Sequence, residues 1–212
     1  MTPSDHLPST FPPPLARRPR RDELAAYAGA TLESLVFPGV RLLFAGINPS
    51  LWAAAVGAHF ARPGNRFWPA LAKAGITSHV FDWAAGMPPE DAEEMRDSGL
   101  GISGFSHRAT ARADELSAEE LRAGGVRLIE RVAEWRPRVV AVLGLTAYRS
   151  AYGVKAKAGR QEPPPAAESG ETEWWVLPNP SGLNAHETLD SLAAAYREVA
   201  ERAGITLRDP TS

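Results

Sequence analysis

The apolar residues of this chain fall into short continuous runs that alternate with longer amphipathic stretches. The runs at 40–46, 138–144 and 174–177 contain mostly apolar side chains, and the first two close with a glycine. Short apolar runs of this kind are typical of strands that are buried on both faces of a parallel sheet. Because helical patterns separate them, we predict an α/β fold: a single domain with a mainly parallel central sheet flanked by helices.

The amphipathic stretches predict the helices. Apolar residues at helical spacing predict helices over residues 22–35, about 65–74, a segment that begins at Ser117, and about 187–203. Ser117 and Glu120 have the spacing of a capping box, in which each side chain binds the backbone of the other residue. The segment 76–115 has no clear pattern, and 155–170, with three consecutive prolines, is predicted to be an exposed loop.

The chain length of 212 residues fits one domain with a terminal tail. Residues 1–21 are rich in proline and arginine and are predicted to form a disordered tail, followed by a folded domain over 22–208. No apolar run reaches the roughly 18 residues needed to span a bilayer, and the first residues lack the apolar core of a secretory signal. We therefore expect a cytoplasmic protein with no role in a membrane.

The absence of certain residues and motifs excludes several kinds of chemistry. The chain has no cysteine, so disulfides, thiolate metal sites, iron–sulfur clusters and a cysteine nucleophile are excluded. The five histidines lack the paired spacing of a zinc site, and we expect each to lie on the surface or to be satisfied by hydrogen bonds. No glycine-rich phosphate-binding motif and no Gly-x-Ser-x-Gly nucleophile elbow occurs, so we expect neither a metal nor another cofactor, and no α/β-hydrolase.

Two of the predicted strands are followed by loops that share the tripeptide Asn-Pro-Ser. It occupies 48–50 after the first strand and 179–181 after the third. Proline restricts the backbone of the asparagine before it, so the amide side chain can be held in one direction. One such loop would be an ordinary turn, because Asn-Pro commonly begins turns. Two of them at the carboxyl ends of parallel strands, where α/β proteins bind ligands, indicate a binding site.

Three motifs, in order along the chain, resemble a known family. They are GINPSL at 46–51, FARPGNRFW at 60–68 and LPNPSGL at 177–183. Together they resemble the mismatch-specific uracil-DNA glycosylases and their thymine-DNA glycosylase relatives, and the resemblance extends over about residues 38–200. It implies a uracil-DNA glycosylase-like fold and a DNA-repair enzyme that removes a damaged or mispaired pyrimidine base from duplex DNA.

The resemblance implies that the target nucleotide is flipped out of the duplex before its base is removed. Ser181, Gly182, Leu183 and Asn184 would then contact the DNA. Leu183 would be the apolar wedge that fills the gap, while Gly182 and Asn184 would hydrogen-bond the partner base. For Leu183 the alternative is an ordinary core position at the start of the last helix.

The flipped base would lie in a pocket formed by other motif residues. Phe60 would stack on the base, because an aromatic ring can pack against the face of any base. Core packing is the alternative role of Phe60. Gly46, Ile47 and Asn179 are the other residues to which the resemblance assigns substrate binding.

Asn48 is the residue to which we assign catalysis. Cleavage of an N-glycosidic bond builds negative charge on the departing base, and dipoles directed at such charge lower the barrier. An amide is a poor general base, so Asn48 would orient a water molecule, and good leaving groups such as uracil should be favoured; relatives of another branch carry Asp here. Asp97 is a second catalytic candidate, as a carboxylate that would assist Asn48. Asp82 and Asp91 lie in the same poorly patterned segment, and a solvated surface charge is the alternative for each carboxylate.

The formal net charge of −2 gives no sign of nucleic-acid binding, so affinity for DNA would depend on local arginines and on the shape of the site. Arg62 and Arg66, within the second motif, are the predicted phosphate contacts, and Arg108 and Arg112 are further candidates. A solvated face is the alternative for each of them.

The chain also departs from the family pattern. Ser50 replaces a glycine, Trp52 and Ala53 replace small polar residues, and Gly104 stands at a position where relatives can carry lysine. A bulky Trp52 would narrow the mouth of the pocket or contact a DNA strand. Substrate range and recognition of the mispair are the properties that these changes affect most.

The sequence therefore predicts a monofunctional, mismatch-specific DNA glycosylase of base excision repair. It would flip out and hydrolytically remove uracil, with thymine and other damaged pyrimidines as further substrates, from G·U or G·T mispairs in double-stranded DNA, leaving an abasic site. No lysine lies in the three motifs, which argues against a lyase step. We expect a monomer that associates with the nucleoid when it acts. Two alternatives remain open: a nucleic-acid binding module without catalysis, and a small-molecule enzyme such as a nucleoside hydrolase.

Overall fold

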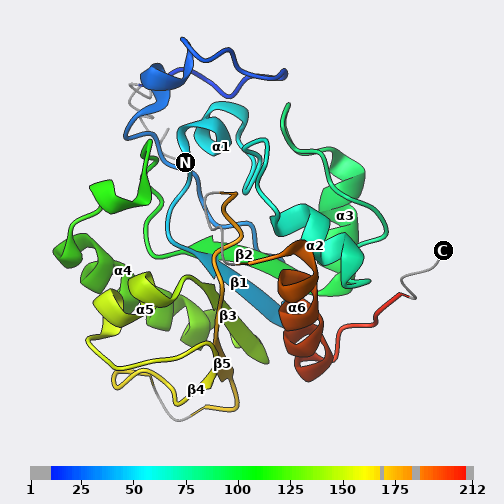
Figure 1. Cartoon of the computed structure of the whole chain (residues 1–212), viewed down its shortest axis with the longest axis vertical. Coiled ribbons are helices and arrows are strands. Elements are labelled where there is room, and N and C mark those ends of the chain that lie inside the picture. The colour runs from blue at the N-terminus through cyan, green and yellow to red at the C-terminus, as the bar shows by residue number, and fades with distance from the viewer. Residues whose placement is uncertain (1–10, 168–169, 183–186, 209–212) are drawn as a thin grey trace, which may run out of the picture.

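Five strands form a sheet in the computed structural model of the chain, which describes residues 11–167, 170–182 and 187–208 (Figure 1). The strand order is β2 (Leu100–Gly104), β1 (Leu42–Gly46), β3 (Val139–Leu143), β5 (Glu173–Leu177) and β4 (Gly159–Gln161). The first four strands in this order are parallel, and β4 pairs antiparallel with β5 at the edge. This arrangement confirms the predicted mainly parallel sheet.

Helices cover both faces of the sheet, as Figure 1 shows. One layer contains α2 (Phe67–Lys73) and α6 (Leu189–Ala203), and the other contains α4 (Ala118–Trp135) and α5 (Leu145–Tyr152). The side chains of β1 alternate between the two layers, as a pleated strand requires. Leu42 and Phe44 pack in the cluster of α2 and α6, whereas Leu43 and Ala45 pack in the cluster of α4 and α5. The predicted α/β fold is therefore confirmed.

The remaining elements are short and connect these layers. They are the 3-10 helices η1 (Leu24–Tyr27) and η2 (Ala113–Glu115) and the helices α1 (Leu51–Val56) and α3 (Pro89–Ser98). The predicted capping box is present at the start of α4, where the Ser117 side chain accepts a hydrogen bond from the backbone of Glu120 and the Glu120 side chain accepts one from the backbone of Ser117. None of the helices in the described part of the chain is long and apolar enough to cross a membrane.

One prediction about the first part of the chain is wrong, and a second is wrong for residues 11–21, while residues 1–10 of the predicted tail lie outside the described residues. Only Leu24–Tyr27 of the predicted helix over 22–35 is helical, because residues after it run beside β2 instead. Leu35 exchanges both backbone hydrogen bonds with Ile102, at 2.8 and 2.7 Å. Of the predicted disordered tail, residues 11–21 are described and pack against the domain, where the backbone N–H of Leu15 donates to the carbonyl of Ala55 at 2.7 Å. Phe11 and Leu15 are part of the apolar cluster around α1.

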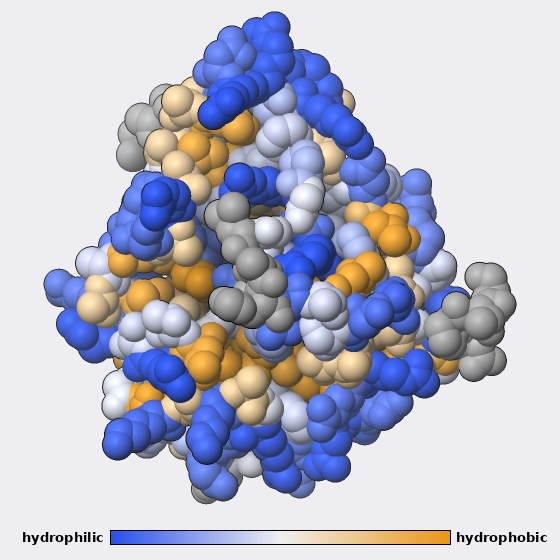
Figure 2. All heavy atoms as spheres, in the orientation of Figure 1, coloured by the Kyte–Doolittle hydropathy of each residue, from blue (hydrophilic) through white to orange (hydrophobic). Residues whose placement is uncertain are grey.

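The segments without a clear sequence pattern contain regular structure. The segment 76–115 forms α3, β2 and η2, and the predicted loop 155–170 contains the short strand β4. On the face drawn in Figure 2, hydrophobic residues are exposed in separate patches between hydrophilic ones.

The register of the sheet places the ends of the parallel strands at one edge. Gly46 at the end of β1 pairs with Gly104 at the end of β2, and Leu143 pairs with Leu177. The loops that follow β1, β2 and β5 therefore begin at the same edge of the sheet, with β3 between β1 and β5, and two of them carry the Asn-Pro-Ser units.

Candidate active site

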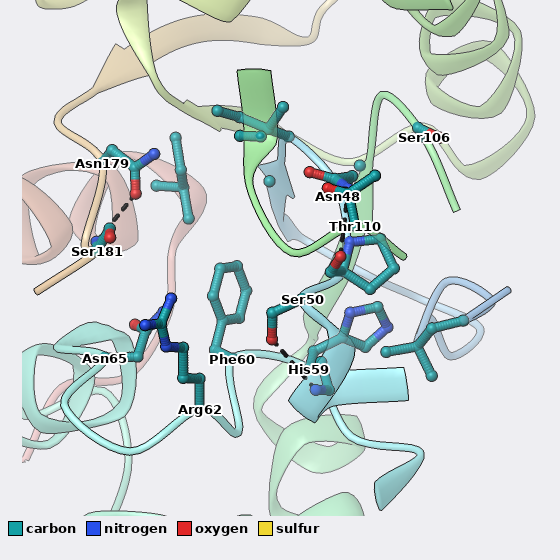
Figure 3. Close-up of a pocket in the computed structure, with 18 of the residues that line it drawn as sticks. Asn48, Ser50, His59, Phe60, Arg62, Asn65, Ser106, Thr110, Asn179 and Ser181 are labelled. Atoms are coloured by element: carbon teal, nitrogen blue, oxygen red, sulfur yellow. Dashed lines mark hydrogen bonds between the residues drawn. The ribbon is translucent and has the colours of Figure 1, made fainter. Parts of the chain in front are cut away.

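A cavity of about 630 Å³ lies at this edge of the sheet. The residues that line it come from the loops after β1, β2 and β5 and from the segment between α1 and α2: among them are Gly46, Ile47, Asn48, Phe60, Arg62, His107, Thr110, Asn179 and Ser181 (Figure 3). Seven of these residues were predicted site residues from separate parts of the sequence: Gly46, Ile47, Asn48, Phe60, Arg62, Asn179 and Ser181. The structure thus brings the three sequence motifs together around one space.

The side chain of Asn48 has one fixed orientation. Its amide nitrogen donates to the carbonyl of Arg108 at 2.9 Å and to the hydroxyl of Thr110 at 2.7 Å, and the carbonyl of Pro49 lies at 3.2 Å. The Thr110 hydroxyl in turn donates to the carbonyl of Arg112 at 2.6 Å, so it is the acceptor toward Asn48. Because these groups need a donor, the NH₂ group must face them and the carbonyl oxygen must point away. Among the described residues, nothing donates to that oxygen.

Phe60 contributes to both the cavity and the core. Its ring stacks on Phe67 with centroids 3.9 Å apart and planes inclined by 21°, and the same residue lines the cavity. A Cβ atom at position 46 would lie 3.4 Å from Cζ of this ring, so Gly46 allows the ring to lie close to β1. The backbone of Phe60 has a φ of 55°, which is costly for a bulky residue. Core packing on one side and a cavity wall on the other are therefore compatible roles.

Residues of the second motif hold the loop after β5 in place. The Asn179 carbonyl oxygen accepts a hydrogen bond from the backbone N–H of Ser181 at 2.9 Å, which turns its NH₂ group outward from the turn. The backbone N–H of Arg66 donates to the carbonyl of Pro180 at 3.0 Å, and the guanidinium donates to the carbonyls of Ser181 and Glu187. Arg66, predicted to contact phosphates, thus binds the loop itself.

Gly182 lies where this loop touches the second motif most closely. A Cβ atom there would be 2.7 Å from the carbonyl oxygen of Gly64, so only glycine fits without a shift. Leu183 and Asn184, the predicted wedge and its neighbour, lie outside the described residues. Their roles stay predictions.

The arginines around the cavity differ in how they are paired. Arg62 is exposed, lines the cavity, and has no ion-pair partner among the residues that the structure describes. Arg108 forms an ion pair with Glu120 at 2.8 Å, and Arg112 forms one with Asp114 at 2.6 Å. Arg62 is thus the lining arginine with the least competition for a phosphate.

The carboxylate predictions are corrected by the structure. Asp97 lies in the last turn of α3, 71% exposed and paired with Arg96, next to the amino end of β2 and thus at the opposite edge of the sheet from the cavity. Asp82 forms an ion pair with Arg18, and buried Asp91 accepts a hydrogen bond from the Trp83 ring at 2.8 Å. Strand β2, which the sequence pattern did not reveal, separates Asp97 from the site.

The carboxylate that does line the cavity is Asp114, in η2. Its ion pair with Arg112 lowers the pKa of Asp114, so this carboxyl is ionised at neutral pH. The sequence contained no signal for it, because residues 110–114 approach the cavity only through the loop after β2. Trp52 also lies elsewhere than expected: its ring nitrogen donates to the carbonyl of Ala84 at 3.1 Å, and the side chain packs on the core.

Two histidines line the cavity, and hydrogen bonds satisfy both. The Nε2 atom of His59 lies 2.8 Å from the carbonyl oxygen of Glu33, and burial lowers the pKa of His59 to about 4. His107 contacts the carboxylate of Glu33 through Nδ1 at 2.9 Å and the hydroxyl of Ser34 through Nε2 at 3.2 Å. Burial also lowers the pKa of His107, so both rings are neutral at physiological pH. Within the described part of the chain, no three His, Asp or Glu side chains are grouped as ligands for a metal ion.

Comparison with known proteins agrees with this geometry. The sequence profile of the Uracil DNA glycosylase superfamily matches residues 33–200. The chain is also similar in structure to a candidate uracil DNA glycosylase from Methanosarcina acetivorans, solved by NMR in solution, with a TM-score of 0.52 and 15% sequence identity over 82% of this chain and 97% of the other. The fold is shared with that protein, and the profile match over most of the chain establishes that this protein belongs to the uracil DNA glycosylase superfamily.

Proposed function

We propose that this protein is a hydrolytic, monofunctional DNA glycosylase that removes uracil from mispairs in double-stranded DNA. The observation that carries the proposal is the fixed amide of Asn48. Its NH₂ group is held by the carbonyl of Arg108 and the hydroxyl of Thr110, so its carbonyl oxygen is available to the cavity. Asn48 follows β1 and lies within the residues that the superfamily profile matches.

The chemistry follows from what an amide oxygen can do. It accepts a hydrogen bond from a water molecule and holds it in place, but it is too weak a base to remove the proton before attack. The glycosidic bond therefore breaks first or concurrently: its electron pair leaves with the base, and the water oxygen forms the new bond to the sugar carbon. The water proton passes to solvent or to the released base. A uracil anion is a good leaving group, which fits a site without a strong base.

The base would occupy the space beside Phe60. The ring of Phe60 projects into the middle of the cavity in Figure 3, between the side that carries Asn48 and the side that carries Asn179. Aromatic stacking contributes about 1–3 kcal/mol per base and tolerates any base. The Asn179 NH₂ group, oriented by the hydrogen bond from Ser181 to its oxygen, would donate to a carbonyl of the base.

Recognition of a mispair in duplex DNA rests on the loop after β5. Arg66 donates hydrogen bonds to the carbonyls of Pro180 and Ser181, and Gly182 lies against the carbonyl of Gly64, so the second motif supports the loop. The motif LPNPSGL supports the prediction that Leu183 enters the duplex. It also supports a G·U mispair as the substrate, with G·T, which carries the larger pyrimidine thymine, as a further substrate. Arg62 would bind a phosphate beside the flipped nucleotide.

The test is incubation of the full chain, in EDTA, with end-labelled duplexes that carry one G·U, A·U or G·T pair, followed by alkali. We expect alkali-labile sites at uracil, with G·U cut faster than A·U, and no strand break before alkali. Equal cutting of G·U and A·U would overturn mismatch specificity but leave the glycosylase in place. Release of uracil from free deoxyuridine at a similar rate would favour a nucleoside hydrolase, and binding without cutting on all duplexes would favour a binding module.

A further inference from the structure

Residues 29–35 run beside the segment that forms one wall of the cavity. The backbone N–H of Gly29 donates to the carbonyl of Ala109 at 2.9 Å, and that of Leu32 donates to the carbonyl of His107 at 3.0 Å. Residues 104–110 are thereby enclosed between this segment and the loop that carries Asn48. Any group that fixes residues 104–110 also fixes the acceptors of the Asn48 amide.

Side chains connect these two segments to α4 through a continuous row of hydrogen bonds. Arg131 of α4 lies 3.2 Å from the Ser103 hydroxyl, which lies 2.8 Å from the Ser34 hydroxyl. The Ser34 hydroxyl lies 3.2 Å from Nε2 of His107, and Nδ1 of His107 lies 2.9 Å from the Glu33 carboxylate. The row therefore begins at a cation and ends at an anion, and both serines contribute only hydroxyl groups.

The neutral ring determines the direction of every hydrogen bond in the row. A guanidinium can only donate and a carboxylate can only accept, whereas a serine hydroxyl donates once and accepts twice. Because Nδ1 faces the Glu33 carboxylate, it carries the ring proton, and Nε2 of the neutral ring accepts from Ser34. Ser34 then accepts from Ser103, which in turn accepts from Arg131. The neutral form of His107 in this row is therefore the Nδ1–H form.

We propose that neutral His107 is a positioning residue for the glycosylase reaction, which holds the cavity wall against Asn48 through the hydrogen-bond row from Arg131 to Glu33. The inference rests on the proposed function for its effect on the rate. His107 precedes Arg108, whose carbonyl accepts from the Asn48 amide, and lies three residues before Thr110, whose hydroxyl is the other acceptor. A displaced His107 would therefore rotate the Asn48 amide, and with it the oxygen that orients the water.

Protonation of His107 reverses two hydrogen bonds of the row. Nε2 becomes a donor, so Ser34 must direct its hydroxyl proton at Ser103, and the buried Ser103 hydroxyl loses its acceptor. The charged and titratable groups around the ring are Glu33, His59, Arg127 and Arg131. Burial is the main cause that lowers the pKa of His107, Arg131 adds to it, and Glu33 opposes it. The neutral form therefore persists to a pH below the ordinary pKa of histidine. The hydrogen-bond directions of the neutral row are lost as pH falls through the folded pKa of His107.

The first test is structural and does not depend on activity. Long-range ¹H–¹⁵N spectra of the full chain report which ring nitrogen carries the proton, and the signals of His107 are those missing from His107→Asn. We expect the Nδ1–H form at neutral pH, and we expect the side-chain NH₂ signals of Asn48 to shift with the titration of His107. An Nε2–H form, or Asn48 signals that ignore this titration, would overturn the proposal.

The second test is the single-turnover rate on a G·U duplex between pH 5 and 8. The native rate should fall with the midpoint that the spectra give for His107, and His107→Asn should lack this acidic limb. Ser34→Ala, a small change that keeps the histidine, should lower the rate roughly tenfold at neutral pH, because small displacements of catalytic groups reduce rates strongly. His79→Asn is the control, since His79 is exposed and outside the cavity, and should behave as native.

The outcomes separate the two proposals. A native rate in Ser34→Ala, or an unchanged acidic limb in His107→Asn, would overturn the positioning role while leaving the glycosylase intact. A chain that cuts no duplex would overturn the proposed function, and the response of the Asn48 signals would still decide whether His107 positions that side chain.

Discussion

Replacing Gly124 with alanine would place a methyl group against the backbone of the cavity wall. Gly124 lies buried in the first half of α4, facing Phe105 at the start of the segment that supplies the acceptors of the Asn48 amide. A Cβ atom there would lie 2.2 Å from the Phe105 carbonyl oxygen and 2.8 Å from the carbonyl carbon. The first distance is 0.8 Å inside the 3.0 Å below which Cβ contacts essentially never occur.

The magnitude follows from two opposing effects. Overpacking costs about 1–3 kcal/mol, and the upper value applies because a backbone carbonyl in the wall cannot rotate away. Alanine is favoured over glycine inside a helix by about 1 kcal/mol. We therefore expect Gly124→Ala to lower the free energy of unfolding by about 2 kcal/mol, which corresponds to a Tm lower by roughly 4–8 °C for a chain of this size.

The adjacent glycine provides a matched control. A Cβ atom at Gly125 would lie 3.0 Å from the Tyr152 ring and 3.2 Å from both the Cβ atom and the carbonyl oxygen of Ala151, so shifts of a few tenths of an ångström relieve these contacts. The helix gain of about 1 kcal/mol should then offset most of the cost, leaving Gly125→Ala near native stability. Urea unfolding followed by circular dichroism gives both values. A Gly124→Ala protein as stable as Gly125→Ala would contradict a close contact between the cavity wall and α4 at this residue.

Three further predictions concern the site. Thr110→Val should lower the single-turnover rate on a G·U duplex by roughly tenfold with little change in DNA affinity, because it removes one acceptor that orients Asn48; an unchanged rate would contradict this role. Arg66→Lys should weaken duplex binding, measured by fluorescence anisotropy, because lysine cannot bind both ends of the loop as Arg66 does; native affinity would show that the loop needs no such support. The free energy of unfolding should fall as pH drops from about 6.5 to about 4, since the folded pKa of His59 is about 4 and only the unfolded chain takes up the proton in this range. His59→Gln should flatten this dependence in urea titrations at several pH values. An equally steep dependence in this variant would assign it to another group.

Three of the strands could be predicted because burial on both faces leaves continuous apolar runs in β1, β3 and β5. Strand β2 could not, since only two residues of its sequence LGISG are large and apolar and the others are glycine or serine. Its burial comes from partners far away in the sequence: residues 29–35 cover one edge, and the missing side chain of Gly124 lets α4 approach. The predicted helix over 22–35 is wrong for the same reason, because pairing with 102–109 outweighs the helical pattern.

The sequence predicted those site residues that directly follow the parallel strands. Asn48 and Asn179 follow parallel strands, which end at one edge of any such sheet, and Phe60 was placed by its motif. Thr110, His107 and Asp114 were missed because they follow the unrecognised strand β2, and Asp97 was misplaced for the same reason. The orientation of the Asn48 amide depends on Arg108 and Thr110, which lie 60 and 62 residues away in the chain, and no local pattern contains these contacts.

In the proposed reaction, the Asn48 carbonyl oxygen orients the attacking water. The most direct measurement is the single-turnover rate of uracil release from a G·U duplex by the native chain and by Asn48→Ala, at protein concentrations where both are saturated with DNA. Loss of a fixed polar group of this kind typically lowers a rate by about 10²–10³-fold. We expect a loss of that size with duplex affinity within about twofold of native. A rate in Asn48→Ala close to the native rate would contradict it.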